Sequence, residues 1–192
     1  MVDARNNLRI RRTDILEAAR LEFAATGYAG ARIERIAAAA KVNKQLLFHY
    51  FGSKEGLFTA ALAAQLEQID TRAHGNDSPV AQLRQWLRDL IVAVRAVPGV
   101  AGFVADARSN PDFPPAAHAL LSAWRERLLA RLAAAVRDGQ RRGYFRDDVD
   151  PAGVAGVALA AVIGVVAVDA APGAPAFEEY LPRLMVEHCA WR

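Results

Sequence analysis

Cationic, amide and aromatic side chains gather in one short stretch of the chain. Residues 44–50 are KQLLFHY, and Lys54 follows shortly after. A lysine suits the O6 and N7 atoms of guanine or a phosphate, and a glutamine suits the N6 and N7 atoms of adenine. A tyrosine hydroxyl and a second lysine suit phosphate oxygens, which position a protein on a duplex without reading its sequence. The stretch therefore predicts contacts with double-stranded DNA.

Two short helices joined by a tight turn would present these side chains. Apolar residues recur at helical spacing over residues 33–41, which predicts the first helix. Asn43 is a good N-cap for the second helix, because its side-chain oxygen can accept from free backbone N–H groups. That helix, residues 44–51, should point Leu47 and Phe51 inward and leave the other side chains at the surface.

This arrangement is the helix-turn-helix plan for reading the major groove. Gly52 should end the second helix, and Ser53 should cap the next one. The sequences GY at residues 27–28 and IERIAAAAKVNKQLLFHYFGSKEGLF at residues 33–58 resemble the signature of the tetracycline-repressor-like (TetR) family. The resemblance covers roughly the first third of the chain. It implies a homodimeric DNA-binding transcriptional regulator, a repressor rather than an activator, with a helical domain for a small effector.

Three positions depart from the family pattern. Ala31 stands where a Thr or Ser usually caps the first of the two helices, and Arg32 beside it can replace a lost phosphate contact. Lys41 stands at a usual glycine, which predicts either a left-handed residue or a different turn. Leu46 replaces a Thr or Ser, and its apolar side chain favours contact with a thymine methyl group.

The predicted DNA contacts combine these positions with the polar stretch. They are Arg32, Lys44, Gln45, Leu46, Phe48, His49, Tyr50 and Lys54. Phe48 has the alternative role of packing on the preceding helix, and His49 can contact either a base or a phosphate. Tyr50 and Lys54 are expected at phosphates.

Residues 1–12 are basic and have no periodic apolar pattern, so we expect a mobile arm that leads into a helix from about Arg9. The arm is either a solvated terminus or a source of phosphate and minor-groove contacts. Its arginines are Arg5, Arg9, Arg11 and Arg12.

Composition favours a helical protein with its basic excess on the motif. The chain has 192 residues, of which 53% are hydrophobic, and it is rich in Ala, Leu and Arg. Residues 1–60 hold ten Lys/Arg against six Asp/Glu, and the rest hold fourteen against fifteen. A basic motif domain beside a neutral domain suits binding to phosphates. The polar N-terminus has no secretory signal pattern, so we expect a cytoplasmic protein.

We therefore predict an all-α protein of about nine helices in two domains. Residues 1–52 should form a three-helix, helix-turn-helix DNA-binding domain, in which a helix ended by Gly27 supports the reader. Residues 53–192 should form a helical domain for effector binding and dimerisation. Breakers at residues 74–79, 98–99 and 143–151 separate its helices.

Residues 152–168 carry no polar side chain. At 1.5 Å per residue the run reaches about 25 Å, short of the ~30 Å hydrocarbon core of a bilayer, so we predict a helix buried on all sides by protein. With the last helix, residues 175–192, it should form half of a four-helix dimer bundle. The expected dimer contacts are Gly153, Gly156, Val157, Ala160, Gly164, Tyr180, Leu181 and Leu184.

The resemblance also implies an effector pocket between the central helices. An effector there would be small and hydrophobic or amphipathic, although such aromatic residues more often fill a core than contact a ligand. The candidate lining residues are Trp86, Arg95, Phe103, His118 and Trp124.

Patterns typical of catalysis or metal binding are absent from the sequence. It contains no Ser/His/Asp order, phosphate loop or suitable pair of carboxylates, and we expect neither an enzyme nor a cofactor. His74, His118 and His188 are too scattered for a metal site. Cys189 should be a small buried apolar residue rather than a redox sensor. The alternative is a helical ligand-binding or enzymatic protein with a vestigial helix-turn-helix, which the departures from the family pattern would suit.

Overall fold

Helices make up most of the part of the chain that the computed structural model describes, residues 2–69, 78–96, 99, 102–104, 107, 110–168 and 177–190. Within these ranges the only strand-like pairing is an isolated bridge between Phe145 and Ala190. The prediction of an all-α protein is confirmed. None of the described helices has the length and apolar character needed to cross a bilayer.

Two compact units make up the chain, and each is described by itself. One comprises Met1–Glu67 and Pro98–Leu121, and the other comprises Gln68–Val97 and Ser122–Arg192. We call them the reader unit and the C-terminal unit.

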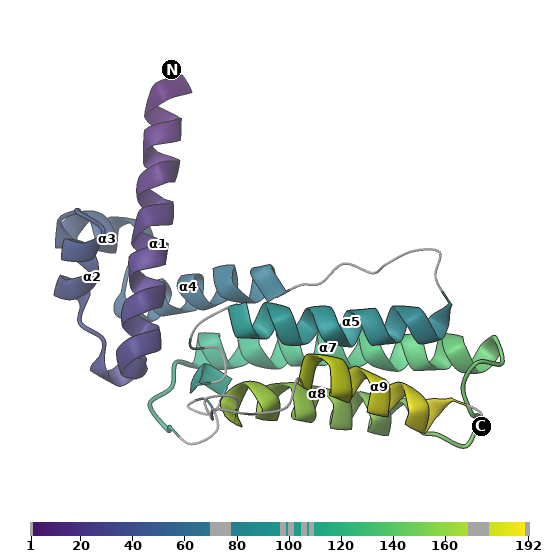
Figure 1. Cartoon of the computed structure of the whole chain (residues 1–192). Coiled ribbons are helices and arrows are strands. Elements are labelled where there is room, and N and C mark those ends of the chain that lie inside the picture. The colour runs from purple at the N-terminus through teal and green to yellow at the C-terminus, as the bar shows by residue number, and fades with distance from the viewer. Residues whose placement is uncertain are drawn as a thin grey trace. The chain divides into compact units, whose positions relative to one another are not determined.

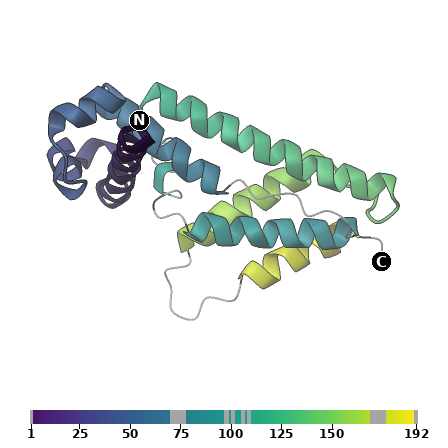
Figure 2. The same cartoon turned by 90° about the horizontal axis from the view of Figure 1, so that it is seen from above.

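The reader unit begins with helices α1 (Val2–Gly30), α2 (Ile33–Ala39), α3 (Lys44–Phe51) and most of α4 (Lys54–Ile69). Figures 1 and 2 show α2 and α3 together on one side of α1. Helix α4 starts directly after α3, where the Ser53 hydroxyl accepts from the Gly56 N–H at 3.0 Å. The predicted cap of this helix is therefore confirmed.

Helix α1 starts earlier than predicted. The non-helical arm expected over residues 1–12 is wrong, because the backbone is helical from Val2. Neither Gly nor Pro interrupts the chain before Gly27, and Ala, Leu and Arg favour helix without any apolar periodicity. Gly27 breaks the helix where expected, with φ 69° and ψ 177°, and a last turn ends at Gly30.

A shared apolar core holds α2 and α3 against α1, as the sequence predicted. The fully or almost fully buried residues are Ile15, Ala19, Phe23, Ile33, Ile36 and Leu47. Phe58 of α4 extends this core through edge-on ring contacts, 4.8 Å from Phe23 and 5.4 Å from Phe113 between centroids. Phe51, which was also expected to point inward, is half-buried, and so is Val42 of the turn.

The turn between α2 and α3 passes through a left-handed residue. Lys41 has φ 54°, and among the described residues it is the one non-glycine with positive φ. The sequence left open whether Lys41 is left-handed or the turn has a different form, and the positive φ shows that Lys41 is left-handed. A left-handed conformation costs a residue with a Cβ atom roughly 1–2 kcal/mol, whereas glycine adopts it freely.

Replacing Lys41 by glycine should therefore stabilise the fold. Glycine also gives the unfolded chain more conformational entropy, which destabilises the fold by about 0.4–1 kcal/mol. The relief of strain is larger, so we expect Lys41→Gly to raise the free energy of unfolding by roughly 0.5–1 kcal/mol. Denaturant unfolding followed by circular dichroism measures this change. Lys41→Ala removes the same charge but keeps the Cβ atom, and it should leave the stability unchanged. Equal stabilisation by both variants would assign the effect to the charge.

The C-terminal unit contains α5 (Pro79–Ala96), most of α7 (Pro115–Arg141), α8 (Pro151–Val168) and α9 (Phe177–Cys189). Helices α5, α8 and α9 pack against one another, and Figure 1 shows them side by side. The breaker predicted at residues 74–79, which includes His74, lies outside the described residues except for Ser78 and Pro79.

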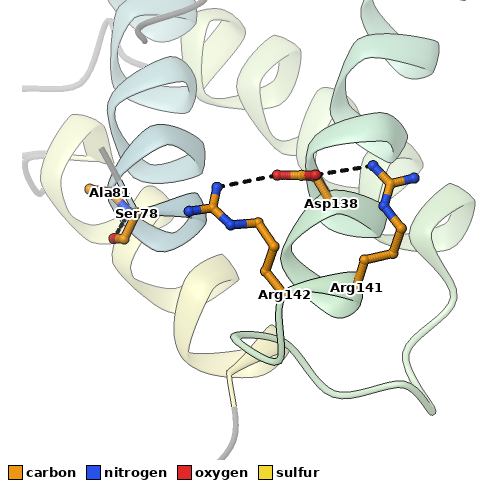
Figure 3. Close-up of polar contacts among 5 residues, drawn as sticks. All are labelled: Ser78, Ala81, Asp138, Arg141 and Arg142. Carbon is orange, nitrogen blue, oxygen red and sulfur yellow. Dashed lines mark hydrogen bonds and ion pairs between the residues drawn. The ribbon is translucent and has the colours of Figure 1, made fainter. Parts of the chain in front are cut away.

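Side-chain caps fix where α5 and α8 begin, and ion pairs lie near the end of α7. The Ser78 hydroxyl accepts from the Ala81 N–H at 3.2 Å at the start of α5 (Figure 3). Near the end of α7 the Asp138 carboxylate lies 3.0 Å from Arg141 and 3.5 Å from Arg142, also visible in Figure 3. The Asp150 carboxylate accepts from the Ala152 and Gly153 N–H groups at the start of α8.

Helix α8 has one buried side and one exposed side within the single chain. The exposed side is the one expected to meet a second subunit, so burial on all sides stays a prediction that depends on the dimer. Its buried side consists of Val154, Ala155, Ala158, Leu159 and Val162. Its exposed side consists of Gly153, Gly156, Val157, Ala160 and Gly164.

Helix α9 continues the exposed apolar side. Tyr180 is 62% exposed and Leu184 is 50% exposed. Leu181 is instead buried beside Met185, since adjacent residues on a helix face directions about 100° apart. It packs inside its own unit, and its role as a dimer contact stays a prediction. We call the exposed residues of α8 together with Tyr180 and Leu184 the α8/α9 face.

Candidate nucleic-acid interface

Helix α3 is fixed at both ends and on its inner side. The Asn43 side-chain oxygen accepts from the Leu46 N–H at 2.7 Å, which makes Asn43 the predicted N-cap. Gly52, with φ 74°, ends the helix. Leu47 has no exposed surface, so it sets the rotation of the helix about its axis. The predicted bounds and inner residue of α3 are confirmed.

The outer side of α3 brings most of the predicted contact residues together. Lys44, Gln45 and His49 are exposed, and Leu46 and Phe48 are half-buried. The Lys44 ammonium lies 5.8 Å from the centroid of the Phe48 ring. This surface offers a cation, an amide, an imidazole and apolar edges, the side-chain types that contact phosphates and base edges.

The start of α2 differs from the sequence interpretation by one residue. Ala31 is buried, and Arg32 rather than Ala31 occupies the N-cap position. Arg32 makes no side-chain cap, and its backbone N–H donates to the Glu22 carboxylate at 3.2 Å. The Arg32 side chain is exposed.

Lys44 is paired with an acid that the sequence did not single out. Its ammonium donates to the Glu34 carboxylate of α2 at 2.5 Å, and the two side chains are 53% and 67% exposed. This hydrogen bond is the main cause that lowers the pKa of Glu34. No periodicity connects residues ten apart on different helices, so only the folded turn reveals the pair.

Two predicted phosphate contacts are turned toward their own chain. The Tyr50 hydroxyl is buried and has no hydrogen-bond partner among the described residues. The Lys54 ammonium donates to the Ala29 carbonyl at 3.2 Å and lies 5.0 Å from the centroid of the Tyr28 ring. Either side chain would have to reorient before it could reach a phosphate.

A groove of about 470 Å³ adjoins the start of α3. Arg11 of α1, Lys41 of the turn and Leu46 are among the residues that line it, together with Asp14. The sequence predicted Arg11 as a possible phosphate contact. For Lys41 it predicted only an unusual backbone conformation and no contact with DNA. The spacing of the two cations in the sequence does not indicate that they share a groove.

The structure divides the five effector-pocket candidates between the two units. Phe103 and His118 belong to the reader unit, and Trp86, Arg95 and Trp124 belong to the C-terminal unit. Phe103, Trp86 and Trp124 are buried. His118 is exposed, and its Nε2 lies 2.8 Å from the Ala107 carbonyl oxygen, so it does not have the expected interior position.

A second groove, of about 640 Å³, opens along the α8/α9 face. Gly153, Val157 and Leu184 line it, with Arg146, Asp148 and His188 also at its surface. Three of the predicted dimer residues therefore share one concave apolar surface.

Metal binding and thiol chemistry have little structural basis in the described part of the chain. No three His, Cys, Asp or Glu side chains come together there as metal ligands would. Cys189 is buried, and burial raises the pKa of its thiol, which disfavours the reactive thiolate.

Comparisons with known proteins agree with the geometry of α2 and α3. Residues 15–61 match the family model described as "Bacterial regulatory proteins, tetR family". The HTH-type transcriptional repressor SCO4008 of Streptomyces coelicolor is 35% identical over 135 residues, which cover 70% of this chain and 67% of that protein. The HTH-type transcriptional repressor Rv1474c of Mycobacterium tuberculosis is 32% identical over 151 residues, which cover 75% of this chain and 74% of that protein. The chain belongs to the TetR family.

A solved structure shares the fold of this TetR-family chain along most of its length. AibR in complex with isovaleryl coenzyme A and operator DNA has a TM-score of 0.72 and 24% identity, covering 94% of this chain and 98% of AibR. The protein is thus a helix-turn-helix transcriptional regulator. A vestigial helix-turn-helix on an enzyme is not favoured, because the repressors named above match well beyond the DNA-binding motif.

Proposed function

We propose that this TetR-family regulator binds a roughly palindromic operator as a homodimer and represses transcription until a small effector releases it. The observation that carries the proposal is the orientation of α3. Leu47 is fully buried while Lys44 and Gln45 are exposed, so packing holds the polar side of this helix outward. A rigid helix with that surface fits the major groove.

The contact residues divide by chemistry. Lys44 and Gln45 read base edges, and Leu46 contacts a thymine methyl group. Arg32, His49, Tyr50 and Lys54 hold phosphates, the last two after reorienting, and Phe48 shields the contact from water. Residues 1–52 bind DNA in this scheme, and residues 53–192 dimerise and bind the effector.

The homodimer forms through the α8/α9 face. Val157, Tyr180 and Leu184 are each at least half exposed in the protomer, which is unusual for adjacent large apolar residues in a soluble protein. The small residues beside them let a partner helix approach closely, and two helices from each protomer make a four-helix bundle. The two copies of α3 must then lie about 34–36 Å apart to meet successive major grooves.

The effector is a small hydrophobic or amphipathic molecule that contacts Trp124. The Trp124 indole N–H is buried and has no hydrogen-bond partner among the described residues, and such a donor is a candidate ligand contact. The complex of AibR with isovaleryl coenzyme A is consistent with this class of effector. The effector binds better to a conformation in which the two copies of α3 are misplaced, and operator DNA weakens effector binding by the same factor.

The protein acts by binding alone, without catalysis, in the cytoplasm where bacterial DNA lies. Gel-shift assays with the DNA that flanks its own gene test the proposal. We expect salt-sensitive binding to one palindromic segment, with a steep fall in affinity as salt rises. Uniform failure to bind any flanking segment, and any duplex selected from random sequence, would rule out the proposed function.

A further inference from the structure

The groove beside the start of α3 brings two cations from separate elements to one concave surface. Arg11 comes from α1, and Lys41 comes from the turn between α2 and α3. Leu46, which is proposed above to contact a thymine methyl group, lines the same groove. The groove therefore borders the surface that meets the duplex in the proposed complex. Phosphate groups flank the major groove there, and the volume of about 470 Å³ is ample for one of them.

Both cations are available to an external anion. Their side chains are exposed, and neither charged group forms a hydrogen bond or ion pair within the described part of the chain. Lys44, in contrast, must leave Glu34 before it can bind elsewhere. Asp14 is the one acid among the described residues that line the groove, so positive charge exceeds negative charge on that lining. Arg11 and Lys41 can thus bind a phosphate without losing a partner.

The backbone of Lys41 gives a second, independent reason to look for such an anion. Its φ of 54° lies in the left-handed region, which glycine adopts without strain and a residue with a Cβ atom does not. No contact of the Lys41 ammonium group within the described residues offsets that strain. Strained residues cluster at sites where their conformation serves a function. A charge that is held at this point of the turn at the expense of stability indicates a partner outside the protomer.

We propose that Arg11 and Lys41 hold a backbone phosphate of the DNA duplex in this groove. The inference rests on the proposed DNA binding by α3, and it adds Lys41 to the residues that contact DNA. A phosphate contact fixes the position of a protein on the duplex and carries no information about the bases. Arg11 and Lys41 are therefore positioning residues, which set where α3 enters the major groove.

Fluorescence anisotropy with the full-length protein tests the inference. The parent and the variants are titrated, at several salt concentrations, with the operator duplex selected by the parent and with a random-sequence duplex of equal length. We expect Lys41→Ala and Arg11→Ala each to weaken binding to both duplexes by the same factor, about 3–10-fold. The ratio of the two affinities should stay as in the parent, and binding should depend less on salt. Lys41→Arg keeps the charge and should keep most of the affinity.

Lys41→Gly separates DNA binding from folding. It should raise the free energy of unfolding, as argued above, and yet bind both duplexes as weakly as Lys41→Ala. A variant that is more stable and binds less tightly cannot owe its loss of affinity to misfolding. Denaturant unfolding and anisotropy on the same preparation measure the two quantities.

Arg20→Gln is the matched control for net charge. Arg20 belongs to α1 in the same unit, pairs with Glu17 and does not line the groove, so this variant should bind like the parent. Unchanged affinity in Lys41→Ala or Arg11→Ala, a loss confined to the operator duplex, no recovery in Lys41→Arg, or an equal loss in Arg20→Gln would each overturn the inference. If the parent binds neither duplex, the proposed function itself fails, which distinguishes the two failures.

Discussion

Val157→Asp is expected to convert the dimer into a monomer. Val157 is 61% exposed in the protomer and lines the groove of the α8/α9 face. In the proposed bundle its side chain is covered by the partner, so the substitution buries a carboxylate without a counter-charge. That burial costs several kcal/mol, which raises the dissociation constant of the dimer by about 100-fold or more.

Sedimentation equilibrium measures this change, and a matched substitution distinguishes it from misfolding. Val92 of α5 is 54% exposed and belongs to the same unit but not to the α8/α9 face. Val92→Asp should remain dimeric, and both variants should keep the helical content of the parent. A dimeric Val157→Asp protein would show that the subunits associate elsewhere, and dissociation of both variants would indicate a general loss of structure.

Operator binding should weaken together with dimerisation. A monomer meets one half-site at a time, whereas the dimer presents two linked readers and gains from their effective concentration. Val157→Asp should therefore lose operator affinity at protein concentrations where the parent is dimeric. Because α3 is untouched, binding to a single half-site by the variant should equal that of a parent protomer.

Local signals explain why α3 could be predicted from the sequence. Asn43 and Gly52 fix its ends through backbone chemistry that acts within a few residues, and Leu47 is the apolar residue that its neighbours can bury. The outward side of the helix follows from these three residues. The roles assigned to its outward side chains remain predictions.

Features that depend on neighbouring elements could not be predicted in the same way. Tyr180, Leu181 and Leu184 all fit one broad apolar stripe, and only the helices packed against α9 decide that Leu181 is covered while its neighbours are exposed. The helical start of α1 was missed because a polar helix has no apolar period to detect. His118 illustrates the same limit, since an aromatic ring on a central helix can face solvent.

Gln45→Ala is expected to lower operator affinity by about 10–100-fold, the loss of one good bidentate base contact. Gln45 is exposed and uncharged, and it follows the capped start of α3. Its loss should therefore leave the folding stability, the dimer and the affinity for random DNA unchanged. The slope of log K against log salt should also stay the same, because no phosphate contact is removed.

Lys44→Ala and Gln45→Ala should differ in the salt dependence of DNA binding. Lys44→Ala removes a positive charge as well as a base contact, so it should lower the operator affinity and also make binding less dependent on salt, whereas Gln45→Ala should not change the salt dependence. Gln68→Ala, at an exposed glutamine of α4, is the matched control and should bind like the parent. Anisotropy titrations at several salt concentrations measure all three variants. If Gln45→Ala keeps the affinity and base preference of the parent, Gln45 does not read the operator, and the proposed orientation of α3 in the groove is wrong.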